Sequence, residues 1–410
     1  MTSLLFTILG VAQAGVLSTY GGGEIGNAGG AGTTVRSPLS AWHNPAAMRT
    51  PRIEQNVEWL YGSHRFEVDG KEIDVSDDAN GLILGAVVGG YWFRVPAVNF
   101  GVATYLPLSG PYAWKEDPIQ ADRNAPTPQM PRYADELNRL DIAMAGNVWI
   151  TDWLSVGVGV DVSTEVEVVT TARIEDIDKP NDAKKAQEAS ITPTLHPYAG
   201  VLVVTGEEGT PGLRLGLVAR SARQMHDHGV SKVKLFELEA RYRHEYVRHQ
   251  APRSVTLGTA LVSPSGFELR ADSTYAFWSE ITGPYGEDLG GAMGDTMNLK
   301  LGVVGNWEDV SVQVGHAYEP NPMRQVPVGS AHLDAAARTW TAGLSRVLVR
   351  PGRRVLRLLL GFQRTRFLPH KPLNPTGPQR MFDGALTAGR LGIELGHKGT
   401  PKGALWSKSR

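Results

Sequence analysis

The chain has 410 residues, and its 41 Lys and Arg nearly balance its 42 Asp and Glu, giving a formal net charge of −1. This balance argues against a nucleic-acid partner, which needs a concentrated positive surface. The absence of cysteine excludes disulfides and thiolate metal sites. Beyond the N-terminus no apolar run reaches the length of a membrane-spanning helix, and no linker or composition break divides the chain into separate domains.

The first residues are typical of an export signal. Residues 4–11 form a short apolar run, and Ala12-Gln13-Ala14 follows it as a small-x-small cleavage site. The segment before the run lacks the usual Lys or Arg. We predict a signal peptide over residues 1–14 and a mature chain from about Gly15.

Residues 15–52 do not have a strand pattern. Glycine clusters at 21–26 and 29–32 are too flexible for a strand, and residues 40–48 are typical of a turn that closes a short helix. The GxGxxG match at 21–26 has neither the preceding strand nor the following helix of a dinucleotide site. We predict a compact plug, or hatch, over residues 15–52, because a large barrel has a lumen that must be filled.

Between residues 53 and 396, apolar residues alternate with small or polar ones, as in 310–314 and 267–277. The alternation predicts strands with one apolar face. We place fourteen strands, at 53–68, 80–95, 99–112, 139–150, 153–173, 189–205, 211–226, 238–263, 266–281, 296–307, 310–320, 337–349, 353–368 and 383–396.

The connections between these strands are alternately long and short. Six are tight turns rich in Pro, Gly and Asp, and seven are longer, including 113–138, 174–188 and 281–296. This rhythm is typical of an outer-membrane barrel, in which the apolar face meets lipid and the polar face lines the lumen. The sequence therefore predicts an all-β fold, a 14-stranded antiparallel transmembrane β-barrel over 53–396 with the hatch in its lumen and a C-terminal tail over 397–410.

The strand alternation also predicts which charged side chains face the lumen. Buried charges must pair with one another or with water. An internal ion-pair network that stiffens the wall or holds the hatch is the general expectation, and direct contact with a substrate carboxylate is the narrower one. The predicted lumen charges are Arg214, Arg220, Arg270, Asp272, Lys300, Arg390 and Glu394.

Several segments together resemble the FadL-type long-chain fatty acid transporters, a family that includes aromatic-hydrocarbon channels. The stretch 29–48, which contains Asn44-Pro45-Ala46, is similar to the family's hatch. Further similar segments follow in the family's order and span nearly the whole chain: 100–107, 151–157, 213–221, 252–258 and 271–279.

The resemblance implies a mechanism for hydrophobic ligands. A ligand is caught between the outer loops, enters a pocket inside, and leaves sideways through a gap at a kink in the third strand after the hatch shifts. It implies a gating role for Asn44, Pro45 and Ala46. The third strand contains Pro107 and Gly110, which weaken strand pairing and permit such a kink, although both also suit an ordinary strand end.

Catalytic and metal motifs are not supported. His244 and His249 are one residue too far apart for the HExxH zinc motif, and His226-Asp227-His228 suits a solvated loop edge better than a metal pair. Neither a GxSxG nucleophile elbow nor a phosphate-binding loop is present. We expect no enzyme activity, no metal and no cofactor.

The leading hypothesis is passive uptake of hydrophobic small molecules, such as long-chain fatty acids, by a monomer in a bacterial outer membrane, surrounded by membrane lipids and lipopolysaccharide. One alternative is a surface interaction, adhesion or receptor protein that displays its loops while the plug stays shut. Another is a water-filled porin, which the plug disfavours.

Overall fold

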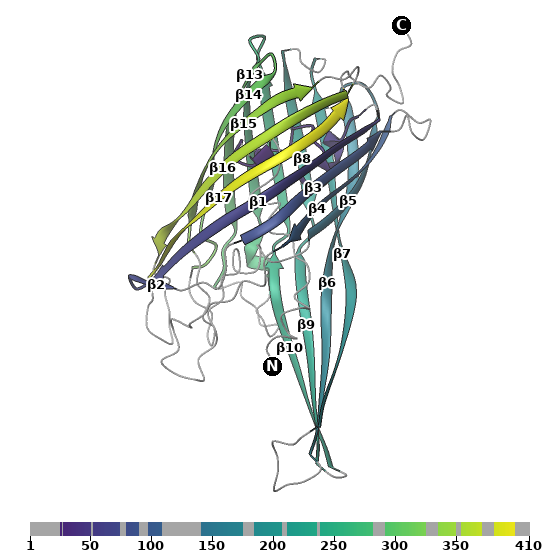
Figure 1. Ribbon diagram of the computed structural model, residues 1–410, viewed down its shortest axis with the longest axis vertical. Coiled ribbons are helices and arrows are strands. Elements are labelled where there is room, and N and C mark those ends of the chain that lie inside the picture. The colour runs from purple at the N-terminus through teal and green to yellow at the C-terminus, as the bar shows by residue number, and fades with distance from the viewer. Residues whose placement is uncertain are drawn as a thin grey trace.

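The structure is a computed structural model (Figure 1). It describes residues 25–26, 28–50, 52–73, 79–89, 97–108, 141–174, 184–206, 211–235, 238–281, 292–324, 335–349, 354–370 and 381–397. The predicted signal peptide, the first part of the predicted hatch, Gly110 and all of the predicted tail except His397 lie outside these residues.

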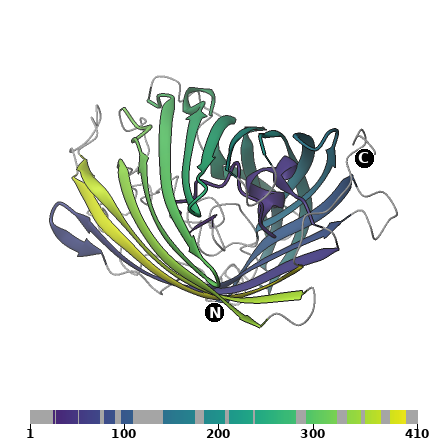
Figure 2. The same ribbon diagram turned by 90° about the horizontal axis from the view of Figure 1, so that it is seen from above.

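Fourteen strands form the closed wall of a barrel, each antiparallel to its neighbours, and the pairing of the first with the last closes the ring (Figure 2). Closure removes the unpaired edges of an open sheet. The predicted all-β, 14-stranded antiparallel barrel is confirmed. In wall order the strands are β1 (Ile53–Val68), β3 (Ala79–Gly89), β4 (Val98–Pro107), β5 (Asp141–Trp149), β6 (Leu154–Ile174), β7 (Lys184–Val204), β8 (Gly212–Arg220), β11 (Ser254–Val262), β12 (Phe267–Ala276), β13 (Thr296–Trp307), β14 (Val310–Glu319), β15 (Ala337–Val349), β16 (Arg354–His370) and β17 (Phe382–His397).

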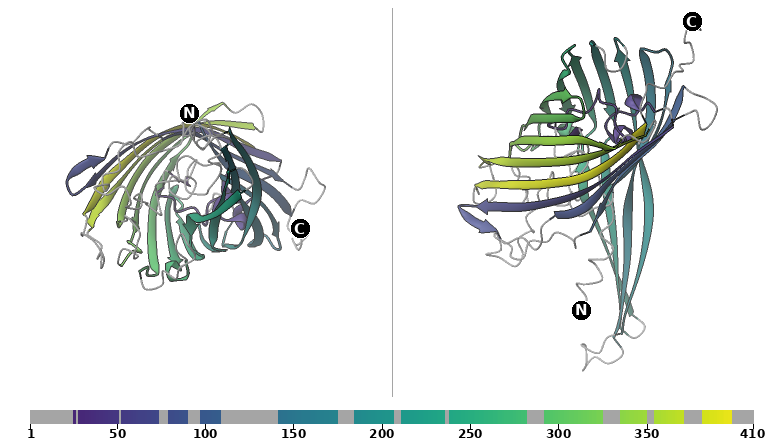
Figure 3. Two further views of the ribbon diagram at one scale, coloured as in Figure 1. Left: turned by 90° about the horizontal axis from the view of Figure 1, so that it is seen from below. Right: turned by 45° about the horizontal axis from the view of Figure 1, so that its top comes forward.

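Three further strands lie beyond the wall. The short β2 (Lys71–Ile73) pairs with the end of β1, while β9 (Arg223–Leu235) and β10 (Leu238–Ala251) form a hairpin between β8 and β11. Together with the outer halves of β6 and β7, β9 and β10 form a projecting arm (Figures 1 and 3).

Two of the predicted wall strands are wrong, because part of each belongs to the arm. Segments 211–226 and 238–263 were each expected to be one wall strand, but each is divided, at 221–222 and at 252–253. The physical reason is a free edge: among the residues that the structure describes, β5 pairs with β6 only as far as Val162, and β9 pairs with β6 in parallel from Glu167. The chain therefore leaves the wall to complete a sheet outside it.

Side chains alternate between the two faces of the wall, as the pleat requires. The outward rows are apolar and exposed, for example Val158 at 67%, Leu257 at 59% and Leu301 at 56%. Inward rows contain buried polar side chains such as Gln313. The outer face is therefore suited to contact hydrocarbon rather than water. Among the described residues, no helix is long and apolar enough to cross a membrane.

The hatch, defined from here on as the described residues between 25 and 50, lies inside the ring (Figure 2). Its second half contains α4 (Ser40–His43), which is one helical turn, and a 3₁₀ turn, η1 (Pro45–Ala47). Both turns contact the wall over β4–β7, and Ala47 packs on Trp149 and Leu202. A second 3₁₀ turn, η5 (Trp278–Glu280), follows β12.

Candidate functional site: the hatch and the wall around it

Asn44 organises the turn that ends the hatch. It is fully buried, and its side-chain Oδ1 accepts the amide of Ala46 at 3.0 Å, which caps the first turn of η1. Its Nδ2 donates to the carbonyl of Thr33 at 2.7 Å. Pro45 starts η1, where a missing amide hydrogen costs nothing. The predicted gating triplet is thus a capped turn tied to an earlier part of the hatch.

The wall holds this turn with two side chains from β5. The Nδ2 of Asn147 donates to the carbonyl of Met48 at 2.7 Å and to that of Ala46 at 3.1 Å, and the indole of Trp149 donates to Met48 at 3.0 Å. Asn147 is 5% exposed, so these bonds are shielded from water. The pattern did not single out Asn147, although a polar residue that follows the apolar and small residues 142–146 on this strand could have been noticed.

A carboxylate on β12 holds the hatch further along the chain. One oxygen of Asp272, Oδ2, accepts the amides of Gly32 and Thr33 at 2.9 and 3.0 Å and the Thr33 hydroxyl at 2.7 Å. Asp272 is 5% exposed, and Lys300 lies directly opposite it on β13. Three donors converge on this single carboxyl oxygen, so this contact is a concentrated anchor of the hatch.

Arg220 at the end of β8 and Tyr198 on β7 hold α4. Arg220 donates to the carbonyl of Trp42, and its guanidinium lies 4.6 Å from the Trp42 ring and 4.5 Å from that of Tyr198. The Tyr198 hydroxyl donates to the carbonyl of Ala41. Burial, with the charges of Lys300 and Arg220 nearby, lowers the pKa of His43 to about 3, so His43 is neutral at ordinary pH.

The hatch backbone lies along a row of inward-facing glycines. A Cβ at Gly200 would be 2.0 Å from the Asn44 Oδ1, and one at Gly315 would be 2.1 Å from the Gly29 nitrogen, so side chains there would push the hatch off the wall. Only glycine, which has no side chain, allows the hatch to approach the wall backbone this closely. The glycines that contact the hatch in this way are Gly85, Gly101, Gly157, Gly200, Gly216, Gly258, Gly302 and Gly315.

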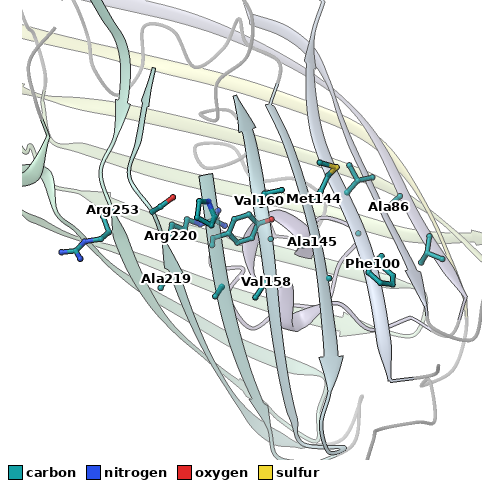
Figure 4. A pocket seen from close by; sticks show the side chains of 18 residues that line it. Ala86, Phe100, Met144, Ala145, Val158, Val160, Ala219, Arg220 and Arg253 are labelled. Atoms are coloured by element: carbon teal, nitrogen blue, oxygen red, sulfur yellow. The ribbon is translucent and has the colours of Figure 1, made fainter. Parts of the chain in front are cut away.

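The outer face of the wall is hollowed where the hatch contacts β4. The hollow has a volume of about 1040 Å³ and crosses β3 to β8, with Phe100, Met144, Val158 and Ala219 in its lining (Figure 4). It follows a single register row of the ladder in which Gly101, Ala145 and Gly159 are consecutive partners.

The wall is thin along this row because these residues lack large side chains. On the inner face, a Cβ at Gly101 would meet the Met48 sulfur at 2.5 Å. Hatch and hollow are therefore separated by little more than backbone.

Four of the predicted lumen charges form ion pairs with residues that the strand pattern did not single out. Arg214 and Arg270 both pair with Glu268, at 3.4 and 2.9 Å. On the other side of the barrel Arg390 lies 3.9 Å from Glu58, and Glu394 pairs with Arg357 at 3.1 Å. Arg220 and Asp272 instead contact the hatch backbone. Strand parity would have marked Glu268, Glu58 and Arg357 as well.

The predicted gap strand is β4. It pairs with β3 without a register shift as far as Pro107, its last residue, opposite Gly81. Its described pairing with β5 runs from Val98 to Tyr105, and Tyr105 lies opposite Asp141, the first described residue of β5.

No protein-family model matches the chain, and no curated protein matches its sequence. Solved structures do match. The toluene transporter TodX of P. putida superposes with a TM-score of 0.58 at 12% identity, over 92% of this chain and 99% of that one.

Two further matches agree with the first. A FadL homologue of Pseudomonas aeruginosa gives a TM-score of 0.55 at 15% identity, over 94% and 98% of the two chains. The CymD monoaromatic hydrocarbon channel gives 0.55 at 11%, over 93% and 99%. The chain therefore has the fold of the FadL- and TodX-type bacterial outer-membrane channels.

Proposed function

We propose that this chain, with the fold of FadL- and TodX-type channels, is an outer-membrane channel for passive uptake of hydrophobic small molecules. The substrates would be long-chain fatty acids or alkyl-aromatic hydrocarbons, the hatch would act as the gate, and the ligand would leave sideways into the membrane. The observation that carries the proposal is the position of the hatch directly behind a thin, apolar hollow in the outer wall.

Physical reasoning supports a sideways exit. An apolar molecule released into hydrocarbon never enters water, which avoids the cost of hydrating its surface. The lining of the hollow is almost entirely apolar, and its inner boundary contains the small residues Gly101 and Ala145. We place the exit between β4 and β5, beside the row that contains Gly101 and Ala145, with Pro107 and Gly110 as the residues that would permit a kink in the third strand. Asn44, Pro45 and Ala46 would move away from β5 to open it.

The test pins β4 to β5. Val102 and Met144 are opposite each other and both face outward, so cysteines at these positions are placed for a cross-strand disulfide, and the chain has no other cysteine. Oxidation of the Val102→Cys/Met144→Cys variant should abolish uptake of a labelled fatty acid or alkyl-aromatic, and reduction should restore it. The matched control is Val312→Cys/Leu344→Cys, an outward pair between β14 and β15. Equal uptake by oxidised and reduced forms of the β4–β5 variant would rule out this exit.

Removing the gate is the complementary experiment. Deleting residues 40–48 takes away α4, η1 and the bonds to Asn147 and Trp149. If the hatch shift controls passage, uptake of the hydrophobic probe should lose its normal control, as either a block or an unregulated leak of polar dyes. Uptake and dye exclusion identical to wild type would count against a gating hatch.

A second candidate function has one observation in its favour. The arm formed by β9, β10 and the outer parts of β6 and β7 projects well beyond the wall, as a surface that displays a binding site to a partner would (Figure 3). If the protein displays a binding site, removing the arm should abolish binding of its partner. If it is a channel, uptake of the hydrophobic probe should survive. A variant without the arm therefore separates the two functions.

A further inference from the structure

A continuous hydrogen-bond chain runs through the hatch from β12 to β4. The Thr33 amide and hydroxyl donate to Asp272, and the Thr33 carbonyl accepts from Asn44 at 2.7 Å. Asn44 accepts from the Ala46 amide at 3.0 Å, and the Ala46 carbonyl accepts from Asn147 at 3.1 Å. The chain thus connects the wall at β12 to the wall at β5, with four wall strands between them.

The chain continues from β5 into β4 and returns to the hatch. The Nδ2 of Asn99 donates to the Oδ1 of Asn147 at 3.0 Å, and the amide of Thr50 donates to the Oδ1 of Asn99 at 3.2 Å. Asn99 is 1% exposed and Thr50 is fully buried. Water therefore does not compete for these bonds.

Every bond in this chain points the same way. Thr50 donates to Asn99, Asn99 to Asn147, Asn147 to Ala46, Ala46 to Asn44, Asn44 to Thr33, and Thr33 to the carboxylate of Asp272. In Asn99, Asn147 and Asn44 a single side-chain amide accepts one bond and donates the next, so these bonds polarise one another. At Ala46 and Thr33 the backbone carries the connection. The Asp272 carboxyl is the one acidic group in this series of bonds, and it lies at the accepting end.

We infer that Asp272 is a positioning residue that controls the β4–β5 side of the wall through this chain. Loss of its acceptor oxygen weakens the docking of residues 32–33 and, through Asn44 and Ala46, the bonds that hold Asn147 and Asn99 in place. The proposed function depends on opening at β4–β5, and the inference supplies the connection from the opposite region of the lumen. It rests on the proposed function only for that consequence, since the coupling itself is a property of the folded chain.

Hydrogen exchange on the purified, detergent-solubilised full chain tests the inference. Asp272→Asn keeps the size of the side chain but replaces the carboxyl group by an amide. We expect amide exchange to rise about tenfold or more in 28–50 and also in 98–107 and 141–149, which Asp272 does not contact. Glu394→Gln is the control, because it removes a lumen carboxylate that pairs within the wall, with Arg357. It should leave those three segments unchanged.

The results separate a coupled chain from a local anchor. Faster exchange confined to residues 28–35 would overturn the inference and leave Asp272 as a simple attachment point. If Asp272→Asn does not assemble, Thr33→Val decides the matter, since it removes one bond to Asp272 and leaves β12 intact. It should produce the same three-segment pattern with a smaller amplitude, and a purely local change would again overturn the coupling.

Uptake measurements keep this inference distinct from the proposed function. If wild type takes up no hydrophobic probe but Asp272→Asn shows the three-segment pattern, the channel proposal fails and the coupling stands. If uptake occurs and exchange changes only beside Asp272, the channel proposal stands and the coupling fails. The approach from the other end is Asn147→Ala, which should accelerate exchange of the Gly32 and Thr33 amides, both bound to β12.

Discussion

Individual glycines determine where the hatch can dock. Gly157 and Gly200 are direct partners on β6 and β7, and together they make room for Asn44 and Pro45 against the ladder. A methyl group at Gly157 would collide with the hatch backbone at Pro45 and Ala46, and one at Gly200 with the side chains of Asn44 and Pro45. The position of the hatch is therefore set by the absence of side chains at the wall glycines, as well as by the hydrogen bonds that Asn147 and Asp272 make.

Gly200→Ala should loosen the hatch without disturbing the barrel. Its new Cβ would be 2.0 Å from the Asn44 Oδ1, and overpacking of this kind costs about 1–3 kcal/mol. In an Ala47→Cys background, where the single thiol replaces a side chain 1% exposed, thiol labelling should speed up by about ten- to a hundredfold. Gly389→Ala is the matched control, since nothing lies within 4 Å of a Cβ there. Equal labelling of the two variants would contradict the docking role of Gly200.

His43 should make the hatch sensitive to acid. Docking lowers its pKa to about 3 from an ordinary value of 6.5, so the undocked hatch binds a proton more readily. The stabilisation of docking is fully present above about pH 6.5 and is lost progressively as pH falls toward 3. Planar-bilayer recordings should therefore show more frequent openings at pH 4.5 than at pH 7.5. His43→Gln should flatten this dependence, and an unchanged pH profile in that variant would assign the effect to another group.

Strand parity predicts which side chains face the lumen but not which atoms they meet. Glu268 and Arg270 share the inward face of one strand, so parity alone could pair them, but that Arg214 also reaches Glu268 emerges only when the register of β8, β11 and β12 is known. The bonds of Asp272 to Gly32 and Thr33 join residues about 240 positions apart. Local patterns contain no information about such contacts, so the ion pairs between strands and the hatch anchors could not be derived from sequence.

At the level of elements, the positions of the fourteen wall strands are predictable from alternation and turn chemistry. The tight turns at 150–153 and 307–310 fix neighbouring strand ends, because their residues favour reversal. The arm is the exception. Alternation continues through the breaks at 221–222 and 252–253, because β9 and β10 are also strands, and only the free edge of β6 decides that they leave the wall.

The arm should be dispensable for barrel assembly. Gln224 and Gln250 are paired on β9 and β10, so replacing residues 225–249 with an Asn-Gly turn closes a short hairpin there. The β8–β11 ladder from Arg220 and Ser254 onward does not involve the excised residues. The variant should keep the heat-modifiable gel mobility of a folded barrel, with uptake at wild-type level. Failure to assemble would show that β9 is needed to guide β8 to β11.

At the scale of the whole molecule, the outward apolar rows require a hydrocarbon environment. Leu257 and Leu261 face outward on β11 with exposed fractions of 59% and 54%, the first in the middle of the strand and the second beside a turn. Leu257→Arg should destabilise the barrel in lipid vesicles by about 2–4 kcal/mol, and Leu261→Arg by at most about 1 kcal/mol. Equilibrium unfolding with denaturant measures both. Equal costs at the two positions would be incompatible with a membrane-spanning wall.

The seam between β1 and β17 joins residues 55–68 to residues 382–395 in an unbroken register. Synthesis delivers β1 first and its seam partner only after more than three hundred further residues, so one edge of β1 stays unsatisfied for most of the time the polypeptide is being made. An open edge of this kind recruits other strands indiscriminately. Biogenesis must therefore rely on a chaperone that shields the unfolded polypeptide before it reaches the membrane. Depletion of that chaperone should yield aggregates instead of partly assembled barrels.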